Sequence, residues 1–551
     1  MTPKKIHIQI VLLWLFLVII SLNGRSYLPI DETRYVTVAW NMWLNNDYLV
    51  PYLNGVAYSH KPPLLFWLIN LGWKVFGVND WWPRLVPSLF ALASVFVTRK
   101  IAGRLWPHLI TIKDNASLIL IGSGLWVLYT TALMFDMMIA FFTTLGVLGM
   151  LMALQDKPKK GWLLFTVAIG GGLLAKGPTI LLQLLPVALL PAWWNINPTK
   201  KLNAKNWYLS LFCAVLGGAA MALMWAIPAG MHGGSEYQRA IFWGQTADRM
   251  VDSFAHNRPF WWYVPILPLL LFPWLLWGRF WQGVKNYKAS EVGIRFCIAW
   301  ALPVFIGFSF ISGKQIHYIL PIFPAFALLI ARYCHVSEQP SNTPNQRSAV
   351  LLIAIATALL GAILLVFPLY QRTHPNLAVW LQQIPLWLGF GVMASGALIY
   401  SLPKKSVSNS IAQLSVMTIA LVTICMFVLI YSAGDAYDVR PISAQLKILE
   451  LSRTPVAYVG KYPGVFNFMG RLEHSPDIIS ADEVPTWFTA HPNGRIIEYI
   501  KRTQAINAQQ VEYMQAYKGV TVAILNREQW LAVSTASNLA KPSQLLDEAD
   551  Q

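Results

Sequence analysis

Long apolar runs separated by short polar loops recur along almost the whole chain. Each run holds about 20 residues, the length that an α-helix needs to cross the hydrocarbon core of a bilayer. The pattern predicts an α-helical polytopic membrane protein with about thirteen transmembrane helices, near residues 6–24, 84–106, 115–131, 136–154, 161–175, 178–196, 207–228, 260–279, 292–311, 316–333, 348–369, 380–401 and 411–432. The first run has no small-residue cleavage site, so we interpret it as a retained span.

The loops between the runs differ in charge. One set is rich in Lys and Arg, includes the segments "DKPKKG", "NPTKKLNAK" and "LPKKS", and shares a side with Lys4 and Lys5. Basic loops mark the cytoplasmic side of a membrane. Because the expected number of spans is odd, we expect the N-terminus in the cytoplasm and the C-terminus on the outer side of the membrane.

Composition agrees with a membrane protein. Of the 551 residues, 56% are hydrophobic and 12% are charged, whereas a soluble domain carries about twice that charged fraction. The net charge of +17 comes from short loops between apolar runs, so it does not indicate nucleic-acid binding. The four cysteines lie within or beside apolar runs, which predicts neither a disulfide framework nor a metal knuckle.

Two regions depart from the pattern of spans and short loops. The first outer loop, about residues 25–83, contains the amphipathic stretches "ETRYVTVAWNMWLNN" and "PPLLFWLINLGWKVFG", which predict interfacial helices. Residues 434–551 are polar, with the strand-like runs "PVAYVG", "RIIEYI" and "VTVAIL". We therefore expect a transmembrane domain over 1–433 and a small C-terminal periplasmic α/β domain over 434–551.

Ionisable and aromatic polar residues gather in the loops and span ends assigned to the outer side. Such residues are costly at membrane depth, so they are candidates for function. The set comprises Asp31, Glu32, Arg34, Tyr58, His60, Lys61, Asp136, Lys176, Arg249, His256, Arg258, Lys314, His317 and Tyr318.

Structural roles account for several of these residues taken singly. Asp31 fits a helix N-cap, and Asp136 fits the start of a helix. Lys176 precedes a glycine, as at the end of a helix, and His317 fits a structural hydrogen-bonding role. These roles do not explain why both signs of charge gather on one face while the other face is basic.

One chemistry suits two carboxylates and several cations at the outer face of a membrane. A sugar carried on a polyprenyl phosphate has its reactive bond at headgroup level, and breaking that bond leaves an anionic phosphate that Lys and Arg side chains stabilise. An acceptor hydroxyl needs a carboxylate base within hydrogen-bond reach. The chain has no Gly-rich nucleotide-binding motif and no paired-Asp metal motif, so the lipid is expected to carry the activated sugar.

The motifs themselves resemble those of a known family. The segment "PIDETRYVTVAWNMWLNNDYLVPYLNGVAYSHKPPLLFWL" resembles the first outer loop of the bacterial aminoarabinose transferases that modify lipid A, and of related glycosyltransferases such as the protein O-mannosyltransferases. The resemblance continues through "LMFDMMIAFF", "LLAKGPTILL", "HNRPFWWYVPILPLLLFPW" and "SGKQIHYILPIFPAFALL", over about the first 335 residues. It implies the multispanning GT-C fold.

The resemblance also implies roles for individual residues. Asp31 matches the catalytic carboxylate of the first loop, and Asp136 matches the second carboxylate at the head of the fourth span. The remaining matches imply a substrate-binding cavity for the lipid phosphate, lined by Tyr35, Tyr58, Lys61, Lys176, Arg258, Lys314 and Tyr318. Glu32, Arg34 and Arg249 join this expected substrate-binding set because they lie in the same outer loops.

One position departs from the aminoarabinose transferases. Their glutamate before the Lys-Pro of the first loop, a position associated with metal binding, is replaced by His60. Histidine also binds zinc, so His60 is a candidate metal ligand, although no cofactor is required by the motifs.

The leading hypothesis is an inner-membrane glycosyltransferase that moves aminoarabinose or a hexose from a polyprenyl phosphate to a periplasmic acceptor, with lipid A as the first choice. A protein or another surface glycan is the alternative acceptor. The rival hypothesis is a transporter or flippase for a lipid-linked glycan, which would need polar residues near the bilayer midplane.

Overall fold

The computed structural model of the chain describes all residues except 1–2, 196–201, 244–257, 288–290, 338–346, 375–378, 403–405, 501–510 and 537–551. It divides into two compact units. We call Met1–Asn23, Ser59–Leu365 and Leu386–Met426 the helical unit, and Gly24–Tyr58, Val366–Pro385 and Phe427–Gln551 the sheet unit. Each unit is built from segments that are distant in the sequence.

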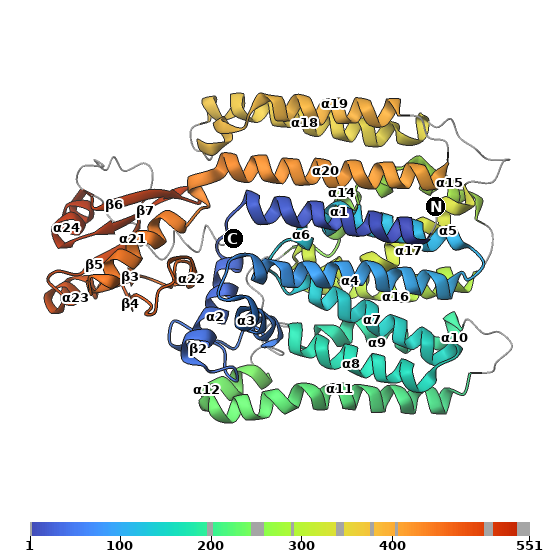
Figure 1. The fold of residues 1–551 in the computed structure, drawn as a ribbon, viewed down its shortest axis with the longest axis horizontal. Coiled ribbons are helices and arrows are strands. Elements are labelled where there is room, and N and C mark those ends of the chain that lie inside the picture. The colour runs from blue at the N-terminus through green and yellow to red at the C-terminus, as the bar shows by residue number, and fades with distance from the viewer. Residues whose placement is uncertain are drawn as a thin grey trace. The chain divides into compact units, whose positions relative to one another are not determined.

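The named elements of the helical unit are all helices, over its described residues (Figure 1). They are α1 (Pro3–Gly24), α3 (Leu64–Phe76), α4 (Trp81–Leu105), α5 (Ile110–Ile121), α6 (Gly124–Thr130), α7 (Asp136–Gln155), α8 (Pro158–Lys176), α9 (Thr179–Ala188), α10 (Pro191–Trp194), α11 (Ala204–His232), α12 (Gly234–Arg239), α14 (Tyr263–Leu270), η2 (Trp274–Leu276), α15 (Gly278–Asn286), α16 (Val292–Phe310), η3 (Ile316–Ile322), α17 (Phe323–Val336), η5 (Ser348–Val350), α18 (Leu351–Thr373), α19 (Leu386–Ser401) and α20 (Val407–Ala433). Helices α18 and α20 continue into the sheet unit.

Eight helical segments of the described chain are long and apolar enough to cross a membrane. They are α1, α4, α7, α11, α16, η3 with α17, η5 with α18, and α20. The expectation of a multi-pass α-helical membrane protein is confirmed. Some other predicted spans are interrupted: the one near 115–131 is divided between α5 and α6, and the one near 178–196 between α9 and α10.

Small residues allow α7, α8 and α11 to pack closely side by side (Figure 1). A Cβ added to Gly161 of α8 would lie 2.4 Å from the backbone nitrogen of Ala153 in α7, and one added to Gly218 of α11 would lie 2.5 Å from Ile169 in α8. Lipid supplies no hydrophobic force between helices, so such close backbone contact is a main source of their association. The packing fixes the ends of α7 and α8, where candidate site residues lie.

The sheet unit combines residues 24–58, the first part of the first loop, with residues 366–385 and the C-terminal part of the chain. Its elements are α2 (Asp31–Asn45), β1 (Tyr52–Leu53), β2 (Val56–Ala57), η6 (Val379–Gln383), η7 (Gly434–Ala436), α21 (Arg440–Leu451), β3 (Val456–Val459), α22 (Asn467–Gly470), β4 (Asp477–Ile479), α23 (Val484–Ala490), β5 (Arg495–Ile500), β6 (Tyr513–Tyr517), β7 (Val520–Leu525) and α24 (Arg527–Ala536). The amphipathic stretches of the first loop form α2 and α3, and the three strand-like runs form β3, β5 and β7.

The five C-terminal strands form one mixed sheet in the order β4-β3-β5-β7-β6. Strand β3 is parallel to β4 and β5, whereas β7 is antiparallel to β5 and β6. Alternate side chains enter two cores: Tyr458 and Ile497 pack with Leu446 of α21, and Ala457 and Ile496 pack with α23. Because successive side chains of a strand point to opposite faces, both faces of the sheet are buried.

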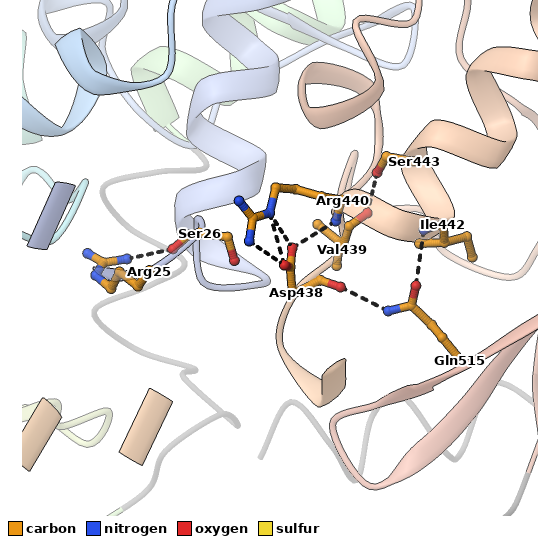
Figure 2. Close-up of polar contacts among 8 residues, drawn as sticks. All are labelled: Arg25, Ser26, Asp438, Val439, Arg440, Ile442, Ser443 and Gln515. Carbon is orange, nitrogen blue, oxygen red and sulfur yellow. Dashed lines mark hydrogen bonds and ion pairs between the residues drawn. The ribbon is translucent and has the colours of Figure 1, made fainter. Parts of the chain in front are cut away.

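Side chains of the sheet unit accept hydrogen bonds from backbone amides at the start of α21 (Figure 2). Asp438 accepts a hydrogen bond from the Arg440 amide at 3.0 Å and pairs with the Arg440 guanidinium. Gln515 of β6 accepts from the Ile442 amide at 3.0 Å and donates to the Asp438 carbonyl at 2.9 Å. These bonds use amides that a helix start leaves without intrahelical partners, and they tie α21 to the sheet.

Candidate active site

The expected site residues fall into two sets, one in each unit. The helical unit holds Lys61, Asp136, Lys176, Arg258, Lys314 and Tyr318, and the sheet unit holds Asp31, Glu32, Arg34, Tyr35 and Tyr58. Arg249 lies outside the described residues, as does His256.

Asp136 is the centre of the set in the helical unit. It is the first residue of α7 and is 2% exposed. The Lys176 ammonium donates to Asp136 Oδ1 at 2.5 Å, and His317 Nε2 lies 3.9 Å from the same oxygen. Lys61 also interacts electrostatically with Asp136. A carboxylate buried this deeply needs such partners, because an unpaired buried charge is strongly unfavourable.

Local backbone features place Lys176 and Tyr318 beside each other. Helix α8 ends at Lys176, and Gly177 follows with φ +70°, which glycine adopts without strain. Tyr318 lies in η3, and the Lys176 ammonium is 5.0 Å from the centre of its ring. The expectation that Lys176 ends a helix is confirmed, and the same lysine contacts a buried carboxylate.

Tyr129 joins this set, although the sequence did not indicate it. Its hydroxyl lies 3.2 Å from His317 Nδ1, so His317 lies between Tyr129 and Asp136. Tyr129 falls within an apolar run, where it resembles an ordinary aromatic residue of a membrane interface. Its place in the set follows from its contact in space with His317 of η3, and the order of residues along the chain does not reveal that contact.

The side chain of Lys314 contacts the backbone of Arg258. The Lys314 ammonium donates to the Arg258 carbonyl at 2.7 Å, and the Arg258 amide donates to the Ser312 carbonyl at 3.2 Å. Lys314 is 4% exposed, and burial lowers its pKa. The Arg258 side chain is exposed, with its guanidinium 5.9 Å from the Trp262 ring. Arg258 is therefore the more accessible of the two cations.

Asp31 in the sheet unit has different surroundings. It is the first residue of α2, and its side chain is 49% exposed. Arg34, one turn along the helix, pairs with Asp31 and lies over the Tyr35 ring at 5.7 Å. Arg34 also interacts electrostatically with Tyr58. The structure thus brings Asp31, Arg34, Tyr35 and Tyr58 together.

The N-cap interpretation of Asp31 is wrong. The N-cap position of α2 belongs to Ile30, and that of α7 belongs to Phe135, neither with a side-chain capping bond. Asp31 and Asp136 instead occupy the first helical turn, where a carboxylate is favoured by the helix dipole.

Glu32 is held by a residue that the sequence did not single out, Arg25. The two side chains form a bidentate pair at 2.5 and 2.8 Å and are 4% and 5% exposed. Glu32 also accepts from the Leu28 amide at 2.8 Å, and Arg25 donates to the Ser26 carbonyl (Figure 2). The pair therefore anchors the chain that leads into α2.

His60, the candidate metal ligand, is exposed. In the part of the chain that the structure describes, no group of three or more His, Cys, Asp or Glu residues is placed to hold a metal ion. The described residues thus do not supply His60 with the further ligands that a zinc site needs, and no step of the chemistry is derived through a metal.

The chain is similar to known proteins both in sequence and in fold. Residues 60–228 match the family described as dolichyl-phosphate-mannose-protein mannosyltransferase. The undecaprenyl phosphate-alpha-4-amino-4-deoxy-L-arabinose arabinosyl transferase of Edwardsiella ictaluri is 29% identical over 374 residues, which is 65% of this chain and 64% of that protein. The enzyme of the same name from Pseudomonas aeruginosa is 29% identical over 391 residues, 69% of each chain.

A solved structure shares the fold over nearly the full length. The crystal structure of ArnT from Cupriavidus metallidurans bound to undecaprenyl phosphate superposes with a TM-score of 0.73 and 18% identity, covering 98% of this chain and 100% of that one. The expected resemblance is confirmed and extends, as a fold, beyond the residues whose motifs carry it. The chain therefore resembles the aminoarabinose transferases in sequence over about two thirds of its length, and it shares the fold of ArnT.

Proposed function

We propose that this protein transfers a sugar from a polyprenyl phosphate to an acceptor at the periplasmic face of the inner membrane. One observation carries the proposal: a deeply buried carboxylate, Asp136, holds Lys176 and His317 close together beside Lys61. The positive charges of Lys176 and Lys61, held in place in this way, suit the negative charge that develops on a departing phosphate. The names of the sequence relatives, which specify an undecaprenyl phosphate donor, support this assignment.

In the proposed reaction, an acceptor oxygen forms a bond to the anomeric carbon of the sugar. The bond from that carbon to the phosphate oxygen breaks, and its electron pair leaves with the polyprenyl phosphate. In this proposal Lys61, Lys176, Arg258 and Lys314 stabilise that phosphate, and Tyr35, Tyr58 and Tyr318 keep the substrate-binding roles that the resemblance implies. Asp31 orients the acceptor and takes its proton when the acceptor is a hydroxyl.

Lipid A is the first acceptor in this proposal. Its phosphate is already ionised, so transfer to it needs no proton acceptor, and Asp31 then acts by orienting the acceptor. Aminoarabinose is the first choice of sugar because the relatives are named for it. A hexose donor, with a protein or another surface glycan as acceptor, is the alternative within the same fold.

The reaction is tested with purified protein in liposomes, undecaprenyl phosphate-aminoarabinose and lipid A. Mass spectrometry of lipid A should show the added sugar. In the alternative arm, a lipid-linked hexose replaces the donor and a secreted protein replaces the acceptor. A lipid-linked sugar that crosses the bilayer with its phosphate bond intact would instead support a flippase. Absence of transfer in every arm would refute the proposal.

Our proposed topology has thirteen crossings, with the N-terminus in the cytoplasm. Five crossings are added to the eight long segments: α5 with α6, α8, α9 with α10, α14 with η2, and α19. We assign 1–433 to a transmembrane domain with interfacial first-loop helices, and 434–551 to a periplasmic α/β domain. Contacts of α2 with residues 464–472 support one shared side for the first loop and this C-terminal region.

The topology is tested by cysteine labelling in a background without the four native cysteines. Lys159→Cys and Asn493→Cys replace exposed residues. A membrane-impermeant reagent should label position 493 in intact spheroplasts and label position 159 only after lysis. The reverse pattern would contradict the proposal.

Metal binding at His60 stays a prediction and is independent of the proposed chemistry. Elemental analysis of the wild type and of His60→Ala and His60→Glu variants tests it. Zinc that is present in the wild type, lost with alanine and retained with glutamate would support a ligand role. Wild-type protein without zinc would contradict it.

A further inference from the structure

Helix α2, which begins with Asp31, is hydrogen-bonded to a C-terminal segment more than 400 residues later in the chain. Thr37 Oγ1 donates to the Gly464 carbonyl at 2.8 Å, and Trp40 Nε1 donates to the Leu472 carbonyl at 2.8 Å. Thr37 and Trp40 are both buried. We call residues 462–475 the clamp segment.

Further contacts join the first loop to the clamp segment. Asn54, in the turn between β1 and β2, donates to the Tyr462 carbonyl at 2.7 Å. Phe468 of α22 makes edge contacts with the rings of Tyr27 and Trp40 at 5.8 and 6.1 Å. The residues that precede α2, α2 itself and the turn that follows it are therefore all held by one short segment.

Gly464 sits where the clamp segment approaches the first loop most closely. A Cβ at this position would lie 2.7 Å from Leu53 Cδ1 and 3.0 Å from Thr37 Cγ2, and its φ is +75°. Only glycine meets both requirements without displacing a neighbour. Gly460, four residues earlier, has φ +100° and no atom within 4 Å of an added Cβ. The two glycines thus share a backbone constraint but differ in contact with α2.

The helical repeat places the clamped face of α2 opposite Asp31. At about 100° per residue, Trp40 lies roughly 180° and Thr37 roughly 240° around the helix from Asp31. The bonded face is buried, whereas the Asp31 side chain is half exposed. Any rotation or shift of α2 on the clamp segment would carry Asp31 with it.

We propose that the clamp segment is a positioning element for the reaction: it fixes α2 through Thr37, Trp40 and Gly464 and so sets the place of Asp31. This inference rests on the proposed function, because it assumes that Asp31 meets the acceptor. It gives the C-terminal region a part in transfer without contact between that region and the substrate. A displacement of about 1 Å at a reacting group lowers a rate by up to roughly 100-fold.

The test compares Gly464→Ala with the matched control Gly460→Ala in full-length protein. Both add a methyl group at positive φ, but only Gly464→Ala pushes against α2. We expect Gly464→Ala to lower kcat by about tenfold or more, with the affinity for undecaprenyl phosphate unchanged. Gly460→Ala should lower the stability of the protein but leave kcat unchanged. Equal kcat in the two variants, or a loss confined to donor affinity, would overturn the positioning role.

Hydrogen exchange provides a readout that does not depend on activity. Amides of α2 should lose protection in Gly464→Ala and keep it in Gly460→Ala. If wild-type protein transferred no sugar with any donor, the proposed function would fail, and this exchange result would still decide whether the clamp segment fixes α2. Equal protection of α2 in both variants would overturn the inference.

A second pair of variants separates the hydrogen bond from packing. Thr37→Val removes the bond to Gly464 but keeps the side-chain shape, and Thr37→Ser keeps the hydroxyl. We expect kcat to fall severalfold in the valine variant and to recover in the serine variant. Thr98→Val is the control, because Thr98 is equally buried and bonds a carbonyl of its own helix, α4. A loss of kcat in Thr98→Val as large as that in Thr37→Val would contradict a specific role.

Discussion

Asp136 and Asp31 both begin helices, but their surroundings differ. Asp136 is 2% exposed and is paired with Lys176 at 2.5 Å, with His317 beyond. The Asp31 side chain is 49% exposed and pairs with Arg34 of its own helix. The charge of Asp136 is balanced by protein groups before any substrate binds, whereas Asp31 keeps accessible surface. The buried carboxylate therefore organises cations, and the exposed one is free to meet an acceptor.

The largest expected effect is at Asp31. Asp31→Asn should reduce transfer to a hydroxyl acceptor by roughly 1,000-fold, because a positioned acid–base group contributes about 10²- to 10⁴-fold. Thermal stability should stay unchanged, since the side chain is half exposed. Transfer assays and melting curves on the purified variant measure both. Asp47→Asn, in the same unit, is the control; near-normal transfer by Asp31→Asn would remove Asp31 from the chemistry.

Asp136 should affect folding as well as activity. Asp136→Asn leaves Lys176 without its counter-charge, and breaking a buried pair costs about 3 to 5 kcal/mol. We expect a lower melting temperature together with lost transfer. Adding Lys176→Met should restore stability but not transfer. If the double variant were less stable than either single variant, charge balance would not explain the role of Asp136.

Glu32, the neighbour of Asp31, is expected to act through structure. Glu32→Gln weakens its buried pair with Arg25 and should lower stability by about 2 kcal/mol, with a smaller loss of kcat than Asp31→Asn. A double-mutant cycle with Arg25→Gln measures the coupling between the two side chains. Additive effects in that cycle would show that the pair is not a unit.

Glu498 of β5 is expected to have the smallest effect on transfer, and it contrasts with Asp136. It is 7% exposed, its Oε2 has no hydrogen-bond partner among the described residues, and burial raises its pKa to about 7 from 4.5. Between these values the folded state binds more protons than the unfolded state, so stability should fall as pH rises from about 4.5 through 7. The slope is at most roughly 1 kcal/mol per pH unit.

Glu498→Gln should remove this pH dependence and stabilise the sheet above pH 7. The stability of the sheet in the full chain is measured by hydrogen exchange of β5 and β7 amides at pH 5 and pH 8, normalised to intrinsic rates. A stability that does not fall between pH 5 and pH 8 in the wild type, or a fall that Glu498→Gln leaves unchanged, would contradict the role of Glu498.

The sequence predicted what depends on local patterns. Apolar runs located the long helices, and separate motifs brought Lys61, Asp136, Lys176 and Tyr318 into one set. It did not identify Arg25, because a single charge in a polar loop looks the same whether it is solvated or paired. Nor did it identify the clamp segment, because the partners of Thr37 and Trp40 are backbone carbonyls, which no side-chain pattern reveals.

The bond between Thr37 and Gly464 spans 427 residues, and this separation has a consequence for synthesis. At about 5 to 20 residues per second, α2 is made on the order of 20 to 90 s before its partner. Throughout that interval the first loop lacks the contacts that hold α2. We therefore expect a nascent or truncated chain to be catalytically silent until the clamp segment has been translated.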